Sequence, residues 1–117
     1  FSLPQAAAVA AAGVTHILPF CEPFKDVGGD PTKLIRDCQD MLENWAERPF
    51  ITAALVRSVE TAEAAIADGA DGIIVFWPIF RDMMNHHLTD EWNSTFLNEW
   101  NDMNRASLLQ DLPIRSN

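Results

Sequence analysis

Helical and strand-like hydrophobic patterns alternate along the chain. Short continuous apolar runs predict strands over residues 15–20, 50–56 and 73–77. Apolar residues at helical spacing predict helices before, between and after these strands, at residues 2–12, 31–45, 59–68, 79–85 and 90–104. Because continuous apolar strands suit a parallel sheet with both faces covered, this order predicts right-handed β–α–β crossovers.

Residues typical of helix ends mark most of these boundaries. Asp30, Ser58 and Thr89 are the expected N-caps of three helices, and a proline follows Asp30 at the first helical position. Gly13 and Gly69 are expected to end the two alanine-rich helices. The pattern therefore predicts where the helices start and stop as well as their number.

The connection at residues 21–29 contains a proline and two adjacent glycines, so it is predicted to be a loop. Residues 12–18 resemble residues 68–74, since in both a helix end and a glycine precede a buried strand. A barrel and an open doubly wound sheet both fit such a repeat. The sequence has no GxGxxG motif, which disfavours the nucleotide-binding form of the open sheet.

The number of strands is small for a barrel. A complete (β/α)8 barrel takes at least ~200 residues, and this chain has 117 residues with three predicted strands. We therefore expect an α/β fold that forms about half of a barrel and leaves two sheet edges unpaired. The first residue is Phe1 and not Met, so we expect a processed or truncated start.

Composition narrows the functional classes. The net charge of −9 disfavours nonspecific binding to nucleic acid or to an anionic membrane, and no apolar run reaches the ~20 residues of a membrane helix. Two cysteines make no disulfide framework, which favours a reduced, cytoplasmic compartment. His16, His86 and His87 have no third ligand at suitable spacing, so no metal site is expected.

Several short segments follow one another at a recognisable spacing along the chain. They are Phe1-Ser2, Gln5-Ala6, residues 12–17, Pro19-Phe20, Gly28-Gly29, Ala53-Ala54, Arg57, residues 67–71, Leu88-Thr89-Asp90 and Trp100. Together they resemble the C-terminal half of the transaldolase family, most closely its small, fructose-6-phosphate aldolase-like members. The resemblance runs from Phe1 to about Asn104, so we expect a half-barrel domain at residues 1–104 and a tail at residues 105–117.

The resemblance implies a TIM-type barrel and a class I aldolase mechanism in the pentose phosphate pathway, with no cofactor. In this mechanism a strand-borne lysine forms a Schiff base with a ketose, either free or phosphorylated, and an acceptor aldehyde takes the three-carbon unit in a transaldolase. The chain has only two lysines, Lys25 and Lys33. Neither corresponds to the family's Schiff-base lysine. The family's catalytic groups would precede Phe1, so no catalytic residue is expected in this chain, and the chain alone is not expected to be active.

The resemblance leaves Phe20 and Arg57 as the substrate-binding residues. Phe20 would face the sugar, and Arg57 would be the remaining contact to a phosphate. The family's serine and arginine near the first strand are replaced by Leu18 and Pro23, and a second serine is replaced by Leu55. From the residues alone, other readings stay open: core packing for Phe20, and for Arg57 a solvated loop or a pair with a nearby glutamate, Glu60 or Glu63.

Two functions remain open. One is a fragment of a Schiff-base aldolase or transaldolase, and the other is a non-catalytic half-barrel that pairs with itself or with another chain. An open half-barrel is expected to expose Ile17, Ala53 and Val75, and the last helix carries a stripe that includes Trp92 and Trp100. We therefore predict a homo-oligomer.

Overall fold

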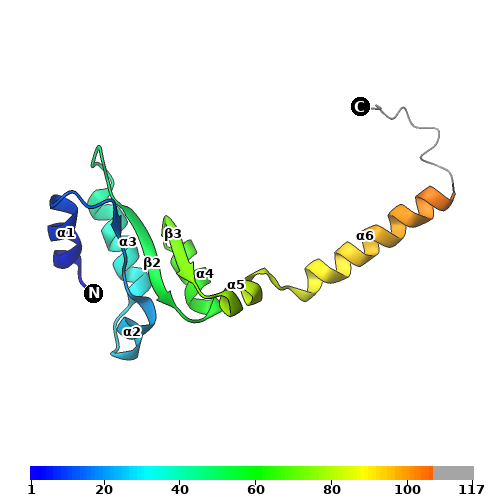
Figure 1. The fold of residues 1–117 in the computed structure, drawn as a ribbon, viewed down its shortest axis with the longest axis horizontal. Helices are drawn as coiled ribbons and strands as arrows, with labels where there is room; N and C mark the ends of the chain where they lie inside the picture. The colour runs from blue at the N-terminus through cyan, green and yellow to red at the C-terminus, as the bar shows by residue number, and fades with distance from the viewer. Residues whose placement is uncertain (107–117) are drawn as a thin grey trace. The chain divides into compact units, whose positions relative to one another are not determined.

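The computed structural model describes residues 1–106. The described residues divide into two units, with the boundary between Met83 and Met84. Figure 1 labels the elements of the first unit, which follow in the order α1 (Leu3–Ala11), β1 (His16–Ile17), α2 (Cys21–Asp26), α3 (Pro31–Leu42), β2 (Phe50–Val56), α4 (Val59–Ala67), β3 (Gly72–Val75) and α5 (Trp77–Met84).

The first unit is built on a parallel sheet with the strand order β1-β2-β3. His16 of β1 pairs with Phe50 of β2, and Thr52 of β2 pairs with Gly72 of β3. Past the short β1, an isolated bridge between Phe20 and Ala54 continues the pairing. The predicted α/β class with parallel crossovers is confirmed, and the three predicted strands are present.

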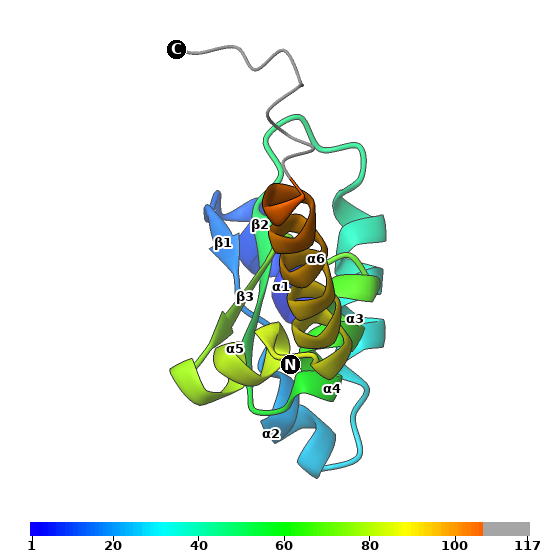
Figure 2. The ribbon, with the colours of Figure 1, turned by 90° about the vertical axis from the view of Figure 1, so that its right-hand side faces the viewer.

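Helices α3 and α4 lie along one face of this sheet, and α1 packs beside α3 and β1 (Figure 2). The core between these helices and the strands contains side chains with almost no exposure, the largest of which are Ile35, Leu42, Ile51, Val56, Cys21 and Cys38. Each fully buried apolar side chain of this size stabilises the fold by ~1.5–3 kcal/mol relative to an exposed one.

Helix caps follow the sequence pattern in this unit. The side chain of Asp30 accepts a hydrogen bond from the amide of Lys33, and the side chain of Ser58 accepts one from the amide of Thr61. Gly69 follows the end of α4 with a φ of +92°, a conformation that glycine adopts without a steric cost. The predicted starts of α3 and α4 are therefore confirmed.

Several local predictions fail in the first unit. Strand β1 covers only His16–Ile17 of the strand predicted at residues 15–20, and α3 ends at Leu42, before the predicted end at residue 45. Residues 21–26 form helix α2 and not a loop. The last strand ends at Val75, and Trp77 begins α5 with Pro78 in its first turn, although the sequence pattern extended the strand to Trp77. Proline needs no amide partner in the first turn of a helix, so it fits the start of α5.

The exposed face of the sheet is the opposite one from that expected. Ala53 is fully buried and Ile17 and Val75 pack against the core, so the prediction that these three residues lie on the open face is wrong. Phe50 and Ile74, which point the other way along their strands, are each about half exposed. Side chains alternate between the two faces of a strand, so the error is a shift of one residue.

A bulge in β2 shifts this alternation near the end of the strand. The pairing register between β2 and β3 changes between Ala53 and Val56, and Leu55 has a φ of +49°. Ala53 and Ala54 are consequently both buried, as is Val56, so that burial does not follow strict alternation at this end of the strand. A non-glycine residue in this conformation stores ~1–3 kcal/mol of strain.

The described part of the second unit is helix α6 (His87–Arg105). Thr89 was the expected N-cap, but the helix starts earlier: the ring of His86 accepts a hydrogen bond from the amide of Leu88, 3.2 Å away, and stacks on the ring of His87. Within residues 1–106, no helix is long and apolar enough to cross a membrane. The predicted tail, residues 105–117, lies mostly outside the described residues.

Candidate functional site

Both predicted substrate-binding residues lie where strands of the parallel sheet end. Phe20 follows β1 and Arg57 follows β2, and the amide of Ala54 donates a hydrogen bond to the carbonyl of Pro19 between them. In Figure 1 the arrowhead of β2 points to the end of the sheet where α2 lies. Loops at this end of parallel strands carry the active sites of α/β barrels.

Glu22, in the first turn of α2, joins the two loops. One carboxylate oxygen, Oε2, accepts a hydrogen bond from the backbone amide of Arg57 at 3.2 Å. The other, Oε1, accepts hydrogen bonds from the hydroxyls of Ser58 at 3.1 Å and Thr61 at 2.7 Å. The carboxylate thus lies at the N-terminus of α4, where the helix dipole favours a negative charge.

The side chain of Arg57 is exposed and forms no salt bridge with any residue in the described part of the chain. The alternative pairing with Glu60 or Glu63 is therefore not observed. Arg57 is held through its backbone amide, and its guanidinium remains available to a ligand.

Phe20 is not a core residue. Its side chain is 40% exposed, and its ring makes an edge-to-face contact with the ring of Phe1, with 5.6 Å between the centroids. Such aromatic pairs contribute ~0.5–1.5 kcal/mol beyond their buried area. The ring can therefore be packed on one side and still offer an apolar surface to a ligand on the other.

Cys21, the residue that follows Phe20, is not suited to nucleophilic catalysis. Its side chain is fully buried, and its thiol lies 3.8 Å from the carbonyl oxygen of Pro19. Burial, with a smaller contribution from the charge of Glu22, raises the pKa of the Cys21 thiol to about 11. The reactive thiolate is therefore scarce at neutral pH.

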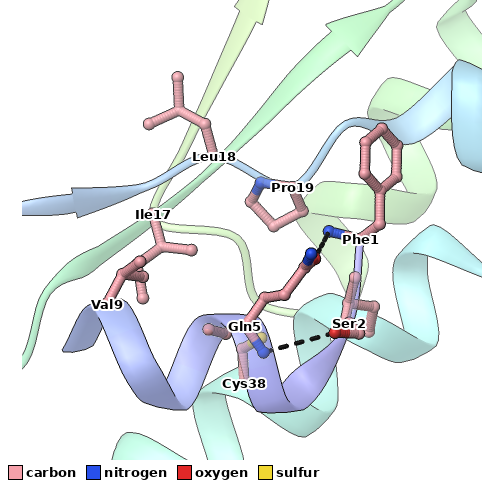
Figure 3. A pocket seen from close by; sticks show the side chains of 10 residues that line it. Phe1, Ser2, Gln5, Val9, Ile17, Leu18, Pro19 and Cys38 are labelled. Carbon is pink, nitrogen blue, oxygen red and sulfur yellow. Dashed lines mark hydrogen bonds between the residues drawn. The ribbon is translucent and has the colours of Figure 1, made fainter. Parts of the chain in front are cut away.

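A cavity of about 100 Å³ lies between α1, β1 and α3, with Phe1 and Pro19 among its lining residues (Figure 3). Ile17 points into it beside Val9, whereas Leu18 points away from α1. Its walls are mainly apolar, and Arg57 is not among its lining residues. Residues 1–106 also contain no group of three potential ligands that could hold a metal ion.

Sequence reasoning did not identify Glu22 or a second polar cluster around Asp71. The Asp71 carboxylate accepts hydrogen bonds from the Arg48 guanidinium, from the Gln39 side-chain amide and from the backbone amide of Ile51. This cluster lies where β2 and β3 begin, at the opposite end of the sheet from Arg57. Its position indicates a role in stability, as is usual for that end of a barrel.

Comparison with known proteins gives one consistent result, although no family model matches the chain. A probable transaldolase of Caulobacter vibrioides is 37% identical over 100 residues, and one of Lactiplantibacillus plantarum is 32% identical over 100 residues. Probable transaldolase 1 of Listeria monocytogenes is 39% identical over 101 residues.

These alignments cover 86% of this chain and 46–47% of the relatives, so the chain spans about half the length of the curated proteins that it matches. Each alignment takes in 100 or 101 residues of this chain. The resemblance of this chain to the transaldolase family is therefore confirmed over most of its length.

Proposed function

We propose that this chain is the C-terminal half of a transaldolase-like TIM barrel that acts on a ketose, free or phosphorylated, in carbohydrate metabolism. The observation that carries the proposal is the position of Phe20 and Arg57 after adjacent parallel strands. Phe20 would pack against the sugar, and Arg57 would bind its polar end. The sequence similarity to probable transaldolases supports the same reaction class.

The Schiff-base lysine of this reaction would come from outside the chain. Lys25 lies in the last turn of α2, and Lys33 lies in the first turn of α3, where it forms an ion pair with Asp37 at 2.6 Å. Both side chains are exposed, so neither lies in an enclosed site of the kind that activates a Schiff-base lysine.

A chimaera tests this proposal. Residues 1–104 would replace the matching half of the Listeria relative, and borohydride trapping with fructose 6-phosphate or dihydroxyacetone would be followed by mass spectrometry. We expect an adduct on a lysine of the relative's half, and none on the isolated chain. A specific adduct on Lys25 or Lys33 would show that the active site lies elsewhere.

A second candidate function is a non-catalytic module that pairs half-barrels. It is favoured by the exposed stripe of α6, whose apolar members are Trp92, Phe96, Leu97, Trp100 and Met103. Phe50 and Ile74 on the sheet add a further exposed apolar surface. We propose a homo-oligomer in the cytoplasm for either function, since free buried cysteines suit a reducing compartment.

A further inference from the structure

We propose that Glu22 is a specificity-determining residue that excludes anions from the loop after β2, so that the ketose is bound there without a phosphate group. The inference rests on the proposed function, since it narrows the substrate class of the same site. It starts from one observation: the loop that presents Arg57 already holds a carboxylate of this chain.

The donors around Glu22 are those that a phosphate group would need. They are the backbone amide of Arg57 and the hydroxyls of Ser58 and Thr61, all within 3.2 Å of a carboxylate oxygen. Thr61 is only 3% exposed, so its hydroxyl has little access to water as an alternative acceptor. A phosphate oxygen could use these donors only after displacing Glu22.

Charge reinforces this competition. Phosphate carries nearly two negative charges at neutral pH, and two like charges a few ångströms apart repel each other strongly where water is partly excluded. The guanidinium of Arg57 attracts an anion, but the neighbouring carboxylate offsets that attraction. The hydroxyls of an uncharged ketose avoid this repulsion and can donate hydrogen bonds to the carboxylate.

The arrangement also fixes Glu22 in place. Its helix follows β1, whereas its three donors follow β2, and they lie 35–39 residues away along the chain. Both carboxylate oxygens are engaged, so the side chain cannot rotate away without losing all three hydrogen bonds. The carboxylate of Glu22 is therefore held in a fixed place at the N-terminus of α4.

Titration of the whole chain with inorganic phosphate tests the proposal. The backbone amide signals of Arg57, Ser58 and Thr61 would be followed by NMR in the wild type, in Glu22→Ala and in Glu22→Gln. We expect no saturable shift in the wild type. Glu22→Ala should bind phosphate about tenfold or more tightly, and Glu22→Gln should fall between the two because its side chain is neutral but still fills the position.

Asp26→Asn is the matched control, since it removes an exposed carboxylate from the same helix, α2. It should behave as the wild type does. Equal phosphate affinity in the wild type and in every folded Glu22 variant, including no binding in any of them, would overturn the proposal. The titration involves no catalytic step, so its failure is distinct from a failure to form the imine in the chimaera.

Discussion

Arg48 binds Asp71 with both ends of its guanidinium group: Nη2 lies 2.8 Å from Oδ1, and Nη1 lies 3.3 Å from Oδ2. The amide of Ile51 donates a third hydrogen bond to this carboxylate at 2.8 Å, and Gln39 of α3 donates a fourth at 2.9 Å. One side chain thus links the starts of β2 and β3 to the helix layer.

Loss of this carboxylate should destabilise the fold. Asp71→Asn replaces a charged acceptor and leaves the amide of Ile51 less well satisfied, so we expect the free energy of unfolding to fall by ~1–2 kcal/mol. Urea denaturation measures this change. The control is Asp82→Asn, whose exposed pair with Arg81 should contribute less than ~0.5 kcal/mol. Equal losses for the two variants would contradict the role of Asp71.

Acid should weaken the same linkage. Partial burial acts to raise the pKa of Asp71, but the hydrogen bonds from Arg48, Ile51 and Gln39 outweigh it, and the pKa lies below its ordinary value of 3.8. A lowered carboxyl pKa stabilises the fold fully above pH 3.8, and this contribution is lost as the pH falls through the lower, folded-state value. The free energy of unfolding should therefore decline less steeply with falling pH in Asp71→Asn than in the wild type. Identical acid slopes would argue against the shift.

Gly29 should not tolerate a side chain. A Cβ atom there would lie 2.5 Å from Cγ of Phe24 and closer still to two other ring carbons. We expect Gly29→Ala to cost ~1–3 kcal/mol through displacement of the ring. Gly72→Ala is the control, since its Cβ would meet Thr52 at an ordinary distance of 3.6 Å. Thermal melting should show a lower melting temperature for Gly29→Ala than for Gly72→Ala. Equal melting temperatures would contradict the importance of the close approach to Phe24.

The two thiols should react slowly while the chain is folded. Cys21 and Cys38 are both buried, and burial is the main cause that raises the pKa of each thiol. A thiol reagent such as dithionitrobenzoate should label them rapidly only after denaturation. Fast labelling of the native chain at neutral pH would show that the core opens more readily than its packing indicates.

The exposed apolar stripe of α6 should drive self-association. Trp100 and Phe96 lie in the exposed stripe of α6 and are each more than half exposed. We expect sedimentation velocity to show a dimer or larger assembly that dissociates on dilution, and Trp100→Ser to weaken it by roughly tenfold or more. Glu99→Ser, a neighbouring change outside the stripe, should have little effect. A compact, cooperatively melting monomer at nanomolar concentration would refute the pairing of half-barrels.

Local signals were enough to predict most helices and strands. Asp30 and Ser58 are N-caps as their residue types indicate, and the strand at residues 50–56 has the predicted bounds. Helix α2 was missed because it has six residues, contains a proline and has no side-chain cap. His86 was missed as a cap because histidine is uncommon in that role.

The site depended on information that local patterns do not contain. Phe20 and Arg57 came from the family resemblance, and their roles stay predictions. Glu22 and its donors are separated by more than 30 residues and meet only because β1 and β2 are parallel neighbours. The open face was assigned wrongly because an apolar strand with no polar alternation gives no indication of which side faces the helices.

The bulge at Leu55 changes which residues of β2 face the helices. Before it, Ile51 and Ala53 are buried at alternate positions, and Ala54 and Val56 continue the buried positions one residue out of step. Arg57 follows directly after the strand and is exposed. Without the bulge, regular alternation from Ala53 would place Val56 on the open face and direct the side chain of Arg57 towards the helix layer. For a side chain introduced into this strand, the face on which it lies therefore depends on whether its position is before or after Leu55.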